Sequence, residues 1–186
     1  MDIELNWSGP FSFIPSQDCQ CIFGDDSAKT PGLYLWTISY EDGYLINYIG
    51  ISASNVAQRQ REHLDLYLCG KYRLYDPKKF VAGKKVVVYQ PEEGFESFLS
   101  RYKELSTTLL QQLQVYRLFV AALDADKPLL EKIETSLITV LRDAGGLTAE
   151  FLGNIRPSRI PQENDRQLIS WKSRHRFVGL PSNIFA

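Results

Sequence analysis

Two apolar runs on either side of a short polar turn form the clearest pattern in the first third of the chain. Residues 32–38 and 44–49 are rich in β-branched and aromatic side chains, and Glu41, Asp42 and Gly43 lie between them. Runs of this composition around Asp-Gly are a strong signal for a β-hairpin. We therefore predict two antiparallel strands joined by a three-residue loop, with Gly43 in the left-handed conformation.

Apolar positions recur at helical spacing further along the chain, and capping residues mark the ends of these segments. Asn55 precedes one such segment and Gly70 follows it, while Asp126 and Pro128 mark the start of another. The predicted elements are helices over residues 56–68, 94–112 and 126–142, and short strands over residues 85–89 and 115–123.

This order of elements gives a small mixed domain, α/β in the broad sense and α+β in arrangement. We expect a central, mainly antiparallel sheet of three strands flanked by helices, over residues 31–154. Residues 1–30 mix aromatic, proline and acidic residues without periodicity, so we interpret them as an irregular N-terminal arm packing on the core. Residues 155–186 are basic and contain prolines, and we interpret them as a C-terminal extension.

Composition is that of an ordinary globular protein. The 186 residues include 44% apolar and 23% charged side chains, and no apolar run approaches the ~20 residues of a membrane span. The acidic start of the chain lacks the basic and apolar regions of a secretory signal. Cys19, Cys21 and Cys69 cannot form a paired framework and lack the spacing of a zinc site. We therefore predict reduced thiols and a cytoplasmic protein.

Charge is unevenly distributed, although the net charge is only −1. Residues 55–90 carry eight Lys or Arg against three acids, and residues 154–176 carry six against two. The first thirty residues have a net charge of −4. This asymmetry suggests two basic patches facing a polyanion, and the alternative is that the charges only solvate the surface.

The hairpin carries tyrosines whose relative placement depends on its loop. A three-residue loop pairs Tyr40 with Tyr44 and sets Tyr34 opposite Gly50. Tyr48 then lies on the same face as Tyr34, diagonally about 7–8 Å away. A two-residue loop would place the two phenols on opposite faces. The alternative is two ordinary strand tyrosines.

Three charged or titratable residues on the predicted helices suggest phosphate and metal chemistry. Arg59 and His63 are four residues apart and share a helix face, which suits the grip of a phosphate, although a solvated polar face is an equal alternative. Glu134 lies at or beside the apolar stripe of its helix, where a carboxylate is costly unless it is paired or holds a metal. One carboxylate is enough to hold Mg²⁺, which keeps most of its waters.

These residues together resemble the GIY-YIG nuclease superfamily, over about two thirds of the chain. The departures are Leu33, which replaces the usual Ile, and a spacing of thirteen residues between the two tyrosines. The matching residues are Gly32, Leu33 and Tyr34, then Tyr48, Ile49 and Gly50, then Arg59 and His63 on a helix, then Glu134 and Ile138, and finally Asn154.

The resemblance implies a divalent-metal-dependent endonuclease that hydrolyses phosphodiester bonds in DNA. Glu134 would hold Mg²⁺ or Mn²⁺, and Arg59 would bind the scissile phosphate. Tyr34 would accept the proton of the attacking water, although a phenol is a poor base unless nearby cations such as Arg59 stabilise its anion. The other implied catalytic residues are Tyr48, which would orient water or phosphate, His63, which would assist Tyr34, and Asn154, which would hydrogen-bond within the site.

Basic and aromatic residues around this site predict contacts with nucleic acid, double-stranded DNA by our interpretation. Because one active centre cannot cut both strands at once, a homodimer is one way to cut a duplex. Two alternatives stay open on the same fold: a catalytically weak nucleic-acid-binding module, or a protein-interaction module. The predicted nucleic-acid contacts are Arg61, Lys71, Arg73, Lys78, Lys79, Arg156 and Arg159, and residues 67–91 are the best candidate for an insertion that reads bases.

Overall fold

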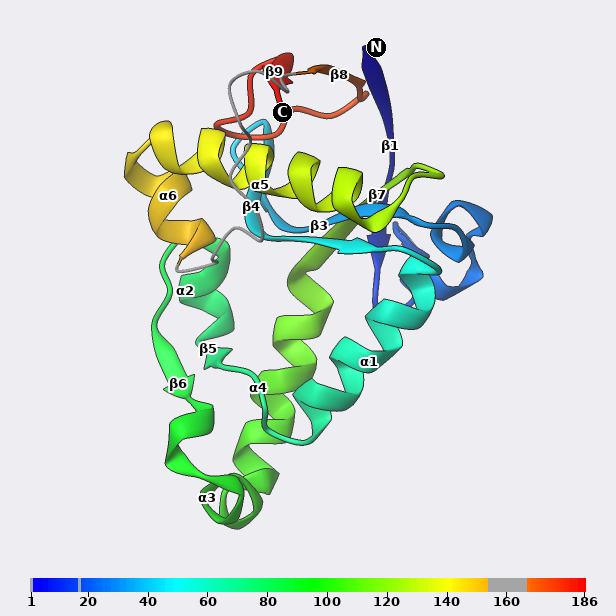
Figure 1. The fold of residues 1–186 in the computed structure, drawn as a ribbon. Coiled ribbons are helices and arrows are strands. Elements are labelled where there is room, and N and C mark those ends of the chain that lie inside the picture. Colours follow the sequence, from blue (N-terminus) through cyan, green and yellow to red (C-terminus); the bar gives the residue numbers. More distant parts are fainter. Residues whose placement is uncertain (1, 17, 154–166) are drawn as a thin grey trace.

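The computed structural model describes residues 2–16, 18–153 and 167–186, which form a curled mixed sheet with helices on both sides (Figure 1). This confirms the mixed α/β class. The strands are β1 (Ile3–Ser12), β2 (Gln20–Cys21), β3 (Gly32–Tyr40), β4 (Gly43–Ser52), β5 (Leu74–Tyr75), β6 (Val87–Tyr89), β7 (Tyr116–Ala122), β8 (Leu168–Lys172) and β9 (Asn183–Phe185). The α-helices are α1 (Val56–Leu68), α2 (Pro77–Val81), α3 (Phe95–Ser100), α4 (Tyr102–Val115), α5 (Lys127–Asp143) and α6 (Gly146–Leu152), and short 3₁₀ turns are Ile22–Gly24, Asp26–Lys29 and Pro91–Glu93.

The sheet is larger than the three strands expected from the sequence. Within the described residues its order is β4-β3-β7-β1-β8-β9, with β2 beside β1 and a separate β5-β6 pair. Strand β3 is antiparallel to both β4 and β7, so the expected antiparallel strands are present as one part of the sheet. Strand β1 continues it, antiparallel to β7 and parallel to β8.

The prediction of an irregular N-terminal arm is wrong for residues 3–12. Ile3, Leu5 and Trp7 are buried and alternate with the exposed Glu4 and Asn6, which is the period of a strand with one buried face. The stretch that follows has a shifted register against β7, so the alternation is short and easy to miss. Residues at the far end of the chain also enter the sheet, as β8 and β9, because β8 pairs with β1.

Capping residues mark the starts of helices α1 and α5 as predicted. Asn55 accepts a hydrogen bond from the Gln58 amide at 2.9 Å and begins α1 where predicted, and Asp126 accepts from the Leu129 amide at 3.0 Å at the start of α5. The single helix predicted over residues 94–112 is wrong, because Arg101 interrupts it and separates α3 from α4. No helix in the described ranges is long and apolar enough to cross a membrane.

Two apolar clusters form the core, one on each face of the sheet. Along β3, Tyr34 and Trp36 enter the cluster that α1, α2 and α4 cover, while Leu33 and Leu35 enter the cluster that α5 covers. Strand β4 lies at the edge of the sheet, and α5 packs against it. Side chains from α5 and from the helices on the opposite face of the sheet can therefore approach one another at the β4 edge.

Candidate functional site

The hairpin that supplies the two tyrosines has a different loop from the one predicted. Tyr40 pairs with Gly43, so the loop has two residues, Glu41 and Asp42. Glu41, not Gly43, has the positive φ, at 49°. Glycine is instead needed at position 43 for space, because a Cβ there would lie 2.6 Å from the backbone oxygen of Arg176.

A β-bulge in β4 restores the register that the two-residue loop would lose. Thr37 pairs with Ile46 but Trp36 pairs with Tyr48, which leaves Asn47 as an extra, unpaired residue. Each residue added to one strand moves the following side chains to the opposite face. The bulge therefore returns Tyr48 to the face on which the longer loop was expected to place it.

Tyr34 and Tyr48 meet over Gly50. Tyr34 is opposite Gly50 in the register, and the two phenol rings have centroids 6.0 Å apart. A Cβ on Gly50 would lie 2.5 Å from the Tyr34 ring and 2.8 Å from the Tyr48 ring. Glycine is thus required at this position so that both rings can lie against the strand.

His63 joins two phenols from different parts of the chain. It is 2% exposed, with Nε2 2.7 Å from the Tyr34 hydroxyl and Nδ1 2.7 Å from the Tyr72 hydroxyl. Burial, helped by the positive charge of Arg59, lowers the pKa of His63 to about 4, so the ring is neutral at pH 7. A neutral imidazole has one N–H and one acceptor, so one phenol donates to the ring and the other accepts from it. We call Tyr34, Tyr48, His63 and Tyr72 the phenol–imidazole cluster.

Arg59 supplies a cation at the border of this cluster. It lies one turn before His63 on α1 and is close enough for its charge to favour ionisation of Tyr34. The guanidinium Nη1 is 2.6 Å from Glu62 Oε2, in a pair whose side chains are 42% and 48% exposed. Such an exposed pair contributes about 0–1 kcal/mol, so a phosphate can replace the Glu62 carboxylate at little cost.

The Tyr34 phenol stays protonated at neutral pH in spite of this cation. Burial raises the pKa of Tyr34 far above its ordinary value, and the neighbouring Tyr48 adds to the effect. Arg59 opposes the rise but does not overcome it. Tyr34 is therefore a hydrogen-bond donor in the free protein, and a phenolate would need further positive charge.

Glu134 reaches the cluster from the other layer of the molecule. It lies on α5 and is 8% exposed. The pKa of Tyr48 is raised by burial and further by the negative charge of Glu134, so the two groups interact electrostatically. The described residues contain no group of three or more His, Cys, Asp or Glu that could hold a metal. A cation here would have Glu134 with waters and substrate oxygens as ligands, a set that Mg²⁺ accepts.

The predicted nucleic-acid contacts do not all lie at this site. Lys71 and Arg73 line a cavity next to the cluster, whereas Lys78 and Lys79 are exposed on α2 and do not line it. Arg61 points away, with its guanidinium 5.5 Å from the centre of the Phe23 ring. Asn154, Arg156 and Arg159 lie outside the described residues.

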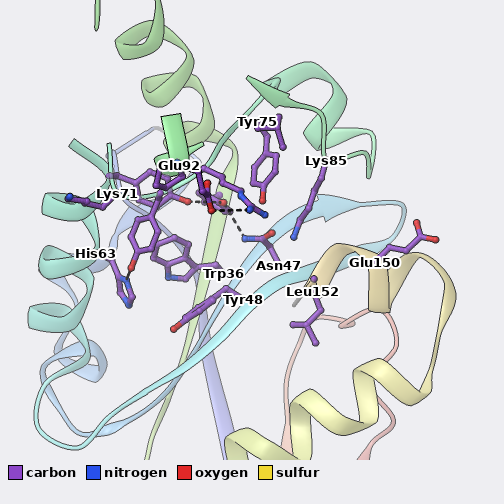
Figure 2. A pocket seen from close by; sticks show the side chains of 17 residues that line it. Trp36, Asn47, Tyr48, His63, Lys71, Tyr75, Lys85, Glu92, Glu150 and Leu152 are labelled. Carbon is purple, nitrogen blue, oxygen red and sulfur yellow. Dashed lines mark hydrogen bonds and ion pairs between the residues drawn. The ribbon is translucent and has the colours of Figure 1, made fainter. Parts of the chain in front are cut away.

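The cavity has a volume of about 650 Å³ and shares three residues with the cluster, Tyr48, His63 and Tyr72. Figure 2 shows Tyr48 and His63 at one end and Lys85 with Glu150 toward the other. We call it the basic cavity, because Lys71, Arg73 and Lys85 line it.

Sequence reasoning missed three residues of this region. Nothing in the spacing of Tyr72 indicates its hydrogen bond to His63. Asn47 is placed by the bulge, which no turn motif announces. Lys85 belongs to the basic segment 55–90 that predicts a patch facing a polyanion, but nothing in the sequence singles it out as a cavity residue.

Comparison with known proteins identified no relative of this chain. No family model, no curated protein and no solved structure matches it. The resemblance seen in the sequence therefore depends on the motif residues themselves, and the geometry above is independent information about them.

Proposed function

We propose that the protein is a GIY-YIG-type nuclease that hydrolyses phosphodiester bonds in DNA with Mg²⁺ or Mn²⁺. One observation carries the proposal. Tyr34, Tyr48, Arg59, His63 and Glu134 come from two strands and two helices, and contacts or electrostatic interactions connect all five. A purely structural set of strand tyrosines would not need a guanidinium and a carboxylate beside it.

Arg59 and Glu134 have separate roles, one toward the negative phosphate and the other toward the divalent cation. Arg59 binds the scissile phosphate, because a guanidinium matches two phosphate oxygens and stabilises the charge that develops on them. Glu134 holds the divalent cation, which supplies neutralisation of the leaving oxygen when bound. Tyr48, between these two groups, orients the phosphate by donating its hydroxyl hydrogen.

Tyr34 removes the water proton by passing its own proton onward. Its hydroxyl gives a proton to Nε2 of His63 while it takes one from the attacking water. Nδ1 of His63 gives its proton to the Tyr72 oxygen, and Tyr72 releases its hydroxyl proton to solvent in the basic cavity. No residue is left charged at the end of this transfer. This suits His63, because burial lowers its pKa to about 4 and disfavours the imidazolium form. The relay resets in reverse: Tyr72 takes a proton from solvent and gives its own to Nδ1, while Nε2 returns a proton to Tyr34, which passes one to the leaving oxygen.

A non-cleaving nucleic-acid-binding module is the second candidate. The observation that favours it is the raised pKa of Tyr34, which makes this phenol a weak base in the free protein. Such a module would bind DNA with a steep dependence on salt concentration and would leave it intact.

A plasmid-nicking assay tests the proposal against this candidate. We expect the wild type to nick supercoiled plasmid with Mg²⁺ or Mn²⁺ and Glu134→Gln to lose this activity. Glu131→Gln is the matched control, because Glu131 lies one turn earlier on α5 and pairs with Lys127 at 3.4 Å. Absence of cutting by the wild type on plasmid and on single strands, with either metal, would overturn the nuclease proposal.

A further inference from the structure

We propose that the basic cavity receives an unstacked nucleotide next to the scissile phosphate, so that the substrate class is single-stranded or locally unpaired nucleic acid. This rests on the proposed function for the position of the scissile phosphate. The cavity adjoins the phenol–imidazole cluster through Tyr48 and His63. A strand whose phosphate lies at Arg59 would therefore place a neighbouring nucleotide at the cavity.

The size of the cavity fits an organic ligand better than a bare phosphate. Its volume of about 650 Å³ lies in the range of roughly 300–1,000 Å³ that is usual for small-molecule sites. A single phosphate would leave most of it unfilled. A nucleoside with its phosphate contains both the flat apolar surface and the charge that the lining residues complement.

Aromatic side chains on the lining offer flat surfaces that neighbouring rings hold in place. The Tyr75 ring stacks on Phe80 with centroids 5.3 Å apart and an angle of 4° between the planes. The Tyr72 ring lies 4.7 Å from that of Tyr67, and its hydroxyl bonds His63. Rings fixed in this way give a base a stacking surface without further ordering, and stacking tolerates every base.

Lys85 places a positive charge in the cavity, and no carboxylate of the described residues forms an ion pair with it. Its ammonium lies 5.6 Å from the Tyr75 ring centre and 5.0 Å from that of Phe151. Burial and the charge of Arg73 lower the pKa of Lys85 to about 8, so it is still mostly charged at pH 7. An anionic group between Lys85 and Arg73 would stabilise the buried ammonium and offset the repulsion between the two cations.

The bulge residue Asn47 offers a polar contact for the base. Its Nδ2 donates to the Tyr116 hydroxyl at 3.2 Å, whereas its buried Oδ1 has no hydrogen-bond partner within the part of the chain that the structure describes. Unsatisfied buried acceptors are rare, and a small rotation of the amide would let Oδ1 accept from the amino group of a base. The carboxylates on the lining, Glu92 and Glu150, disfavour a second phosphate, and Glu92 is 3.4 Å from Arg73.

Paired bases cannot use such a cavity without leaving the helix. A base in a duplex is stacked on both sides, and its extrusion costs unpairing and unstacking. A single strand or a mismatched base avoids this cost. The cavity therefore favours unpaired nucleotides over duplex DNA.

The experiment measures binding in a protein that does not cut. Glu134→Gln is titrated with a short DNA strand that contains one 2-aminopurine, and with the same strand annealed to its complement. We expect the single strand to bind at least about fivefold more tightly than the duplex and the fluorescence to fall as the base stacks. Equal affinity for strand and duplex, with no change in fluorescence, would overturn the inference.

Variants in this background locate the contact. Lys85→Met and Tyr75→Leu are each expected to weaken single-strand binding at least about fivefold and to remove the fluorescence change. Lys84→Met is the matched control, because Lys84 is the exposed neighbour and does not line the cavity. Thermal unfolding confirms that each variant is folded, and Lys85→Met provides the test should Tyr75→Leu not fold. Parental binding by a folded Lys85→Met would place the strand elsewhere.

Plasmid nicking separates failure of the inference from failure of the proposed function. If the wild type nicks plasmid and Lys85→Met retains its activity and strand preference, the cavity assignment is wrong and the nuclease proposal stands. If nothing is cut but single strands bind through Lys85, the nuclease proposal is wrong and the cavity remains a nucleotide-binding site.

Discussion

The phenol–imidazole cluster and the basic cavity share three residues but differ in the charge that they carry. In the cluster, neutral groups are buried and hydrogen-bonded, and burial moves the pKa values of Tyr34 and His63 toward the uncharged forms. In the cavity, Lys85 remains mostly charged at pH 7 beside aromatic walls. The comparison teaches that the buried phenols and imidazole stay neutral, whereas cations lie beside them, at Arg59 and in the cavity, where the proposed substrate phosphate would meet them.

Removal of the border cation Arg59 is expected to have the largest effect on this division. Arg59→Ala should lower nicking by at least about 100-fold, because the phosphate loses its charged partner. The free energy of unfolding should change by less than about 1 kcal/mol, because the pair with Glu62 is exposed. Nicking rates and urea unfolding measure the two effects. A variant that keeps wild-type nicking would show that phosphate binds outside the cluster.

Protonation of His63 is the most direct way to break the neutral cluster. Its pKa is about 4 in the folded protein and about 6.5 in the unfolded chain, so the unfolded chain binds more protons between these values. The free energy of unfolding should therefore fall by roughly 3 kcal/mol as pH falls from 6.5 to 4, and this contribution should change no further below pH 4.

Urea unfolding at several pH values measures this loss, with His63→Gln as the reference. The variant retains Arg59, Glu62 and the other groups near the ring, so the difference between the two curves isolates the histidine. Parallel curves for the two proteins would contradict the buried neutral ring.

Crowding at Gly50 should disturb the cluster without a change of charge. Gly50→Ala places a methyl group 2.5 Å from the Tyr34 ring, and we expect a loss of about 1–3 kcal/mol in unfolding free energy together with reduced nicking. Gly24→Ala is the control, because no atom lies within 4 Å of a Cβ at that position. Equal stability of the two variants would mean that the tyrosine rings do not lie against Gly50.

Loss of the Tyr72 hydroxyl should have the smallest effect and is the sharpest test of the boundary between the two regions. Tyr72→Phe keeps the ring for stacking but removes the hydrogen bond to His63 Nδ1, which should cost about 1 kcal/mol in stability. We expect kcat to fall about tenfold with KM unchanged. Tyr102→Phe, an exposed position on α4, is the matched control. An increase in KM with kcat unchanged would place Tyr72 in binding and remove it from the proton path.

Local sequence determined helices α1 and α5 and the identity of the candidate residues. Asn55 and Asp126 cap α1 and α5 as expected, because a capping side chain acts within three residues of its own position. The spacing of Arg59 and His63 on one helix likewise follows from helical periodicity alone. The site roles stay predictions, since order along a chain does not establish chemistry.

Tertiary structure decided how these residues meet. The bulge at Asn47 corrects for the short loop, β1 joins the sheet through pairing with β7 and β8, and Tyr72 reaches His63 across a turn. Each depends on packing between segments that are far apart in the chain or on a register that neighbouring residues do not specify. Burial then determines which groups are charged, and burial is a property of the assembled molecule.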